Sequence, residues 1–154
     1  MVIEYLTKIE KIDSIIIWGR SMGGATAILY LGHNEPHPKV TTLILDSPFD
    51  DYQTSLGKVF RDTYSCDEKI NDIVINKVKK LLNVDLTTDL IPLNHVHKVK
   101  IPTLFIHGER DTLVFPECSK KLLEKCGSSK KELFLFNGTH NSSRHIGGAF
   151  EKCF

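Results

Sequence analysis

The chain has 154 residues, a length that suits one domain with a buried core. Its 41% hydrophobic and 25% charged residues are typical of a globular protein, and its formal net charge is +1. This balance argues against a nucleic-acid partner or an anionic membrane surface, and no apolar run has the length of a transmembrane segment.

The first part of the chain predicts helices and strands in alternation. Residues 1–11 carry apolar side chains at helical spacing, and the β-branched run at 15–18 is typical of a buried strand. Residues 24–31 begin with small side chains and then turn apolar, which predicts a helix that packs closely on that strand, with Gly32 as its end. A second strand is expected at residues 41–45.

The rest of the chain continues this alternation after a region of different character. Residues 50–95 show helical spacing without strand alternation, notably at 70–78. Strands are expected at 101–107 and 132–136, with a helix at 116–125 between them. Strands that alternate with helices predict an α/β fold with a mostly parallel sheet and flanking helices.

The cysteines are scattered and form no C-x-x-C pair: Cys66, Cys118, Cys126 and Cys153. This pattern predicts reduced thiols rather than a disulfide framework or a zinc site. The N-terminus lacks signal-peptide character. A cytoplasmic protein is therefore expected.

Residues 19–23, Gly-Arg-Ser-Met-Gly, have the G-x-S-x-G form of a nucleophile elbow, and they lie between a predicted strand and a predicted helix. The turn is expected to require glycine at both flanks, Gly19 and Gly23, because a side chain at either position would contact the neighbouring strand or helix. The Ser21 hydroxyl would be exposed at the tip of the turn, near a helix N-terminus. There the backbone N–H of Met22 would face a developing negative charge.

A serine nucleophile needs a base and a group that orients the base, and such groups gather beyond the carboxyl ends of parallel strands. Asp111 follows the strand at 101–107 by a short loop, and His140 follows the last strand by a glycine turn. The chain order serine, aspartate, histidine is the order expected with a nucleophile elbow.

Two other residues compete for these roles. Asp46 follows the second strand and could serve as the acid, although an aspartate that caps the following turn is the favoured interpretation. His145 could replace His140 as the base, but it does not follow a glycine turn after a strand. His107 ends a strand beside the site and is expected to orient the Asp111 loop.

Other polar residues in the middle of the chain have simpler interpretations. His95 and His97 alternate as metal ligands do, yet no carboxylate or thiolate partner is spaced nearby, so both are expected to face solvent. Lys77, Lys79 and Lys80 are expected to form the solvated face of a helix.

These motifs resemble the α/β-hydrolase superfamily of serine esterases, lipases and aminopeptidase-like enzymes. The resemblance rests on residues 19–24, 45–49, 101–111 and 138–140, in the family's order, and covers the C-terminal two thirds of that fold. It implies an incomplete α/β-hydrolase fold. The hydrolase core would comprise residues 1–49 and 99–154, and residues 50–98 would form a helical cap.

The resemblance also implies a mechanism. Ser21 would be the nucleophile, His140 the general base and Asp111 the acid that orients it. The reaction would be the hydrolysis of a carboxylic ester, thioester or amide of a small-molecule or acylated substrate. The resemblance implies no metal and no organic cofactor.

The chain departs from the family before the elbow strand. Family members carry further strands there, and a loop that donates a second amide to the oxyanion. Three interpretations compete: part of a longer protein, a strand edge that pairs with another chain, or a degenerate copy. The first is favoured, because an intact triad is not expected to persist without use. The alternative to a hydrolase is a binding or assembly module, a homo-oligomer whose contact runs along the edge of residues 15–18.

Overall fold

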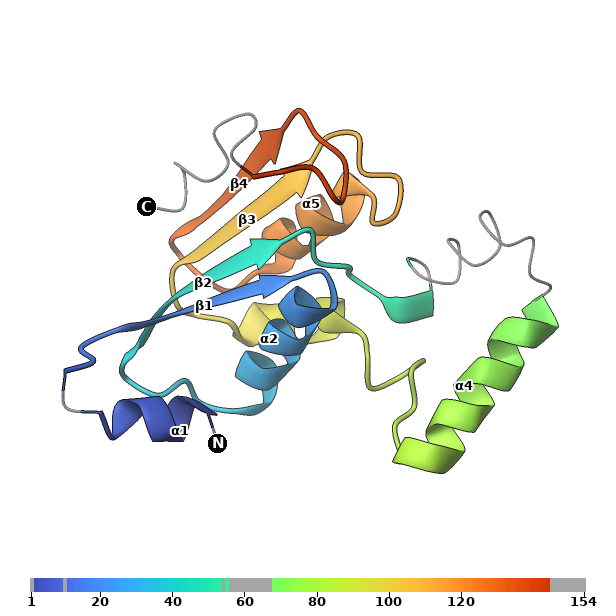
Figure 1. Cartoon of the computed structure of the whole chain (residues 1–154), viewed down its shortest axis with the longest axis horizontal. Helices are drawn as coiled ribbons and strands as arrows, with labels where there is room; N and C mark the ends of the chain where they lie inside the picture. Colours follow the sequence, from blue (N-terminus) through green and yellow to red (C-terminus); the bar gives the residue numbers. More distant parts are fainter. Residues whose placement is uncertain (1, 10, 54, 56–67, 145–154) are drawn as a thin grey trace.

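A computed structural model describes residues 2–9, 11–53, 55 and 68–144 of the chain (Figure 1). Four strands form one sheet in chain order: β1 (Ile15–Arg20), β2 (Val40–Asp46), β3 (Thr103–Gly108) and β4 (Lys131–Phe136). Each neighbouring pair is parallel. The predicted α/β class with a parallel sheet is thus confirmed.

The helices follow the predicted alternation: α1 (Val2–Thr7), α2 (Met22–His33), α4 (Glu68–Leu82) and α5 (Pro116–Lys125), with the 3-10 helices η1 (Pro92–Asn94) and η2 (Val96–Lys98) before β3. Helix α5 has the predicted bounds, whereas α1 is shorter than the expected helix and α2 continues past Gly32. Within the described residues, no helix is both long and apolar enough to cross a membrane.

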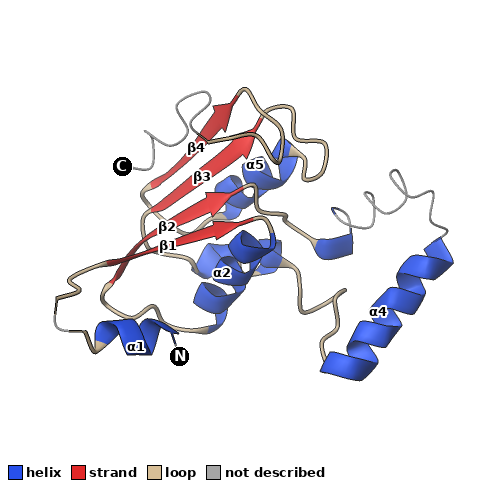
Figure 2. Ribbon diagram, viewed as in Figure 1, coloured by secondary structure: helices blue, strands red, loops and turns tan. Residues whose placement is uncertain are grey.

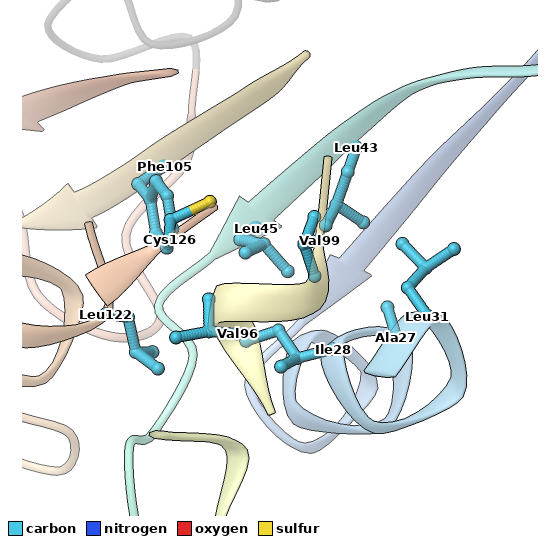
Figure 3. Close-up of a cluster of buried hydrophobic side chains, with 10 residues drawn as sticks. All are labelled: Ala27, Ile28, Leu31, Leu43, Leu45, Val96, Val99, Phe105, Leu122 and Cys126. Atoms are coloured by element: carbon cyan, nitrogen blue, oxygen red, sulfur yellow. The ribbon is translucent and has the colours of Figure 1, made fainter. Parts of the chain in front are cut away.

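Helices α2 and α5 cover one face of the sheet (Figure 2). Alternate residues of the strands point to this face, and Leu43, Leu45 and Phe105 are fully buried there. Ile28 from α2 and Leu122 from α5 pack against them, as Figure 3 shows. This core fixes both helices relative to the carboxyl ends of the strands, where the candidate site lies.

The opposite face of the sheet is unevenly covered. Ile44, Ile106 and Phe136 are buried on it, whereas Ile16 and Trp18 of β1 are 49% and 40% exposed. Among the described residues β1 pairs with β2 alone, so its other edge has no strand partner there. The expected open edge of the elbow strand is therefore present in this part of the chain.

Helix α4 lies at the periphery, beyond α2 (Figure 1). Its Ile75 is buried in a second apolar cluster, which also contains Phe49 and Val114, and its half-buried Val78 packs against that cluster. Lysines 77, 79 and 80 are exposed on α4, as expected for a solvated helix face. Lys79 also forms an ion pair with Asp85. The division of the chain into core and cap stays a prediction.

The thiols that the structure describes are buried and free: Cys118 and Cys126. Burial raises the pKa of Cys118 to about 11. The predicted absence of a disulfide agrees with these two residues, while Cys66 and Cys153 lie outside the described part of the chain.

Candidate active site

Ser21 occupies the sharp turn between β1 and α2. Its backbone has φ 49° and ψ −114°, a left-handed conformation that L-residues adopt only under constraint. Its N–H donates to the carbonyl oxygen of Asp46 at 2.8 Å, which ties the turn to the end of β2. Ser21 is also the N-cap of α2, but its side chain makes no capping hydrogen bond. The hydroxyl is therefore left for another partner.

The glycines of this turn differ in what they allow. A Cβ added to Gly19 would lie 2.5 Å from the carbonyl oxygen of Gly23, which is too close for any side chain. A Cβ on Gly24 would lie 3.0 Å from the Gly19 oxygen, whereas one on Gly23 would meet no described atom within 4 Å. The steric expectation is thus confirmed for Gly19 and wrong for Gly23; Gly24, not Gly23, makes the second close approach.

His140 and Asp111 are brought together by the loops that follow β4 and β3. The Nδ1 atom of His140 lies 2.7 Å from Oδ2 of Asp111, and both side chains are buried. A carboxylate in this position accepts the Nδ1–H hydrogen bond, so Nε2 of the neutral imidazole is unprotonated and can accept a proton. The pair thus has the geometry of a general base with its orienting acid.

The backbone also holds the Asp111 carboxylate. Its Oδ1 accepts hydrogen bonds from the N–H groups of Leu113 and Val114 at 3.0 and 2.9 Å. Burial alone would raise the pKa of Asp111, but hydrogen bonds from His107, His140 and the Val114 N–H outweigh it and hold that pKa well below its ordinary value. Asp111 therefore remains ionised at neutral pH.

His107 supports the loop that carries Asp111, as expected. Its ring is fully buried, with Nδ1 2.6 Å from the Ser119 hydroxyl and Nε2 2.8 Å from the carbonyl oxygen of Val114. Because that carbonyl can only accept, Nε2 carries the proton, and it points also toward Asp111 Oδ2 at 3.4 Å. His107 thus joins α5 to the Asp111 loop.

The His140 loop lies beside the nucleophile turn. Arg20, the residue before Ser21, donates from Nη2 to the carbonyl oxygen of His140 at 2.6 Å and to Oδ1 of Asn141 at 2.9 Å. Within the described residues the Ser21 hydroxyl makes no hydrogen bond to His140. The structure therefore brings the acid and base into contact and places the serine at the same edge of the sheet. The alternative base, His145, lies outside the described residues.

Asp46 has a role that the sequence analysis did not foresee. Its buried carboxylate forms a two-pronged ion pair with Arg144, with Nη2 2.6 Å from Oδ1 and Nε 2.9 Å from Oδ2. The expectation that it caps the following turn is wrong: among the described residues its carboxylate accepts hydrogen bonds from Arg144 and none from the backbone of that turn. Arg144 also donates from Nη1 to the carbonyl oxygen of His140 at 2.9 Å.

Sequence reasoning missed the two arginines for different reasons. Arg20 lies inside the G-x-S-x-G motif, so its position indicates that it is close to the site. The motif does not predict where its side chain points. Arg144 reaches across 98 positions to Asp46, and no local pattern carries that information.

Of the two histidines before β3, only His97 faces solvent as expected. His97 is exposed, but His95 is half-buried against α2, with its ring 4.5 Å from that of His33 and its Nδ1 buried without a partner. Burial, followed by the nearby His33, lowers the pKa of His95. In the described ranges, no three His, Cys, Asp or Glu side chains come together as a metal site would require.

Comparisons with known proteins identify the family and the fold of the chain. The serine hydrolase (FSH1) family profile matches residues 1–142. Protein bem46 of Schizosaccharomyces pombe is 28% identical over 153 residues, which are 97% of this chain and 46% of that protein. The uncharacterized protein YqkD of Bacillus subtilis is 28% identical over 127 residues, 82% of this chain and 41% of that protein. The chain thus spans less than half the length of these curated relatives.

Solved structures share the fold. An esterase from Pyrococcus furiosus superposes with a TM-score of 0.66 at 22% identity, over 90% of this chain and 51% of that one. A monoacylglycerol lipase from Paleococcus ferrophilus superposes with a TM-score of 0.60 at 20% identity, over 98% of this chain and 67% of that one. These likenesses show the α/β-hydrolase fold.

Proposed function

The chain belongs to the serine hydrolase (FSH1) family, and from that premise we propose that it hydrolyses a carboxylic ester, thioester or amide through Ser21, His140 and Asp111. The observation that carries the proposal is the hydrogen bond between His140 Nδ1 and Asp111 Oδ2 at the edge of the sheet where the strained Ser21 turn lies.

In the proposed reaction, the Ser21 oxygen attacks the acyl carbon while Nε2 of His140 takes the hydroxyl proton. Asp111 holds the Nδ1–H tautomer and stabilises the imidazolium that forms. The imidazolium then gives its proton to the leaving group, and an acyl-serine remains. Water attacks this ester by the same route and releases the acid.

The negative charge of the tetrahedral intermediate would be stabilised at the start of α2. The Met22 N–H is the first backbone donor after Ser21, and the first turn of a helix presents unpaired N–H groups with a positive dipole end. We assign Met22 N–H to the oxyanion hole. Each such donor is worth about 100- to 1000-fold in rate.

An apolar acyl group is the favoured substrate class, because the predicted cap carries apolar side chains. Of these, Ile73 and Val74 of α4 are exposed, while Leu56, Val59 and Phe60 lie outside the described residues. The structural neighbours include an esterase and a monoacylglycerol lipase, which also favours an ester. The free thiols of Cys118 and Cys126 favour a reducing, cytoplasmic setting.

A fluorophosphonate probe tests the proposal, because it reacts covalently with an activated serine. We expect the wild-type chain to be labelled on Ser21, as located by peptide mass spectrometry, and S21A to remain unlabelled. Ser129→Ala, at an exposed serine outside the site, is the matched control and should label as wild type does. A wild-type chain that takes up no probe, or takes it up elsewhere, would contradict the proposal.

The exposed edge of β1 favours a second candidate, an assembly module that pairs this strand with a second copy of the chain. Ile16 and Trp18 are exposed beside that edge, and residues 14–19 carry no charged side chain. A two-fold axis would set the strand antiparallel to itself, so uncharged residues would face each other without repulsion.

Light scattering distinguishes this candidate. A dimer is expected for the wild type, and Ile16→Lys should shift it to a monomer because each edge would then carry a desolvated charge. Ile73→Lys places the same change on α4, at a residue that is 63% exposed, and should leave the dimer intact. A monomeric wild-type chain that hydrolyses nitrophenyl esters would exclude the assembly function.

A further inference from the structure

Two arginines that take no part in the proposed chemistry donate to one carbonyl oxygen, that of His140. Nη2 of Arg20 lies 2.6 Å from it and Nη1 of Arg144 lies 2.9 Å from it. We propose that Arg144, fixed by Asp46 and assisted by Arg20, is a positioning residue that holds the His140 loop in register with the Ser21 turn. This inference rests on the proposed function.

The anchor of Arg144 is rigid. Two of its nitrogens bind the two oxygens of Asp46 in a fork, and the side chains of Arg144 and Asp46 are 10% and 2% exposed. A planar guanidinium that binds a carboxylate through two parallel hydrogen bonds has a fixed orientation as well as a fixed distance. The third nitrogen, Nη1, is therefore aimed at the His140 carbonyl by the other two.

Asp46 connects this anchor to the nucleophile. Its backbone oxygen accepts the N–H of Ser21 at 2.8 Å, and its carboxylate binds Arg144. One residue thus holds the backbone of the serine with one group and, through Arg144, the backbone of the histidine with another. A shift of the carboxyl end of β2 would move both partners together, which preserves their relative placement.

The contacts of Asp46, Arg144 and Arg20 form a clamp on the His140 loop. This clamp also involves the ends of strands other than β2. Arg20 comes from β1 and also binds Asn141, and the Arg144 guanidinium carbon lies 5.2 Å from the centroid of the Phe136 ring at the end of β4. The His140 loop is thus held from β1, β2 and β4, while Asp111 holds the imidazole from the loop after β3. A displacement of about 1 Å between reacting groups lowers a rate about 100-fold, so this clamp bears directly on acylation.

The test measures Ser21 labelling at saturating fluorophosphonate, at a temperature where circular dichroism shows every variant folded. We expect Arg144→Met to label about 100-fold more slowly than wild type. Added guanidinium ion should restore part of this rate, and methylammonium should not, because only the planar cation reproduces the fork. Arg110→Met removes an exposed arginine outside this network and should label at the wild-type rate.

A second variant keeps the test decisive if Arg144→Met does not fold. Combining Asp46→Asn with Arg144→Met leaves no buried unpaired charge yet removes the fork, and it should label as slowly as the single variant. Labelling of either variant at the wild-type rate would overturn the inference and leave the proposed function standing.

The His140 Nδ1–H proton signal gives a readout that does not depend on activity. Because this proton is held in a short hydrogen bond to Asp111, its downfield resonance should be sharp in the wild type and broadened in Arg144→Met. If the wild type takes up no probe, the proposed function fails, and this signal alone decides the inference. A broadened signal supports a clamp on the His140 loop, and an unchanged one overturns it.

Discussion

Replacement of Asp111 by asparagine is expected to slow the acylation of Ser21 by about four orders of magnitude while the chain remains folded. An asparagine amide keeps the shape of the side chain and can still accept the N–H groups of Leu113 and Val114 through its oxygen. Its NH₂ group, however, would face Nδ1 of His140 as a donor. The imidazole would then carry its proton on Nε2, where it cannot accept the proton of the serine.

The rate of fluorophosphonate labelling and the hydrolysis of a nitrophenyl ester both measure this effect. Asp72→Asn makes the same chemical change at an exposed position of α4 and should react at the wild-type rate. If the rate of Asp111→Asn is within about tenfold of the wild-type rate, Asp111 does not orient the base, and another residue has that role.

The same substitution has a defined effect on stability as a function of pH. The pKa of Asp111 is well below its ordinary value in the folded chain, so the unfolded chain binds its proton first as the solution is acidified. The stability that ionised Asp111 contributes is present above the pKa of an unfolded aspartate and is lost as the pH falls through the folded pKa. The difference in free energy of unfolding between wild type and Asp111→Asn should therefore stay constant near neutrality and narrow as the pH falls below the pKa of an unfolded aspartate.

Local patterns were sufficient to predict the strands of the sheet and the described α-helices, although not the 3-10 helices before β3. The β-branched run before the elbow predicted β1, the small residues after it predicted α2, and the proline at the start of 116–125 predicted α5 with its observed bounds. Each depends on neighbours within a turn or two along the chain. The positions of Asp111 and His140 followed from one topological rule, that parallel strands end at the same edge of the sheet, and the structure brings the two into contact.

Two of the incorrect predictions, those for Asp46 and His95, concern contacts between distant segments, and the third concerns close approaches within the nucleophile turn. Asp46 was expected to cap a turn because a local role was the simplest one, yet its partner is Arg144. Gly23 was expected to be sterically required, but the close approaches in the turn are made at Gly19 and Gly24. His95 packs against α2 rather than facing solvent, because the 3-10 helices before β3 lie against that helix. Contacts between residues far apart in the sequence leave no signal in local patterns.

The two flanking glycines of the motif provide a matched pair of substitutions. Gly19→Ala is expected to destabilise the chain by about 3 kcal/mol, at the upper end of the range for overpacking, because the new methyl group would lie 2.5 Å from a backbone oxygen that cannot rotate away. To relieve the clash the turn must open. That movement displaces Ser21, so labelling should fall by about 100-fold or more.

Gly23→Ala should have the opposite effect on stability. Its methyl group would meet no described atom within 4 Å, and alanine is favoured over glycine in a helix by up to about 1 kcal/mol. Urea unfolding followed by circular dichroism measures both changes, with equal m-values as the sign that the unfolded states are comparable. If Gly19→Ala matches the wild type in stability, the Gly19–Gly23 contact does not constrain the turn. If Gly23→Ala lowers the free energy of unfolding more than Gly19→Ala does, another part of the protein occupies the space beside Gly23.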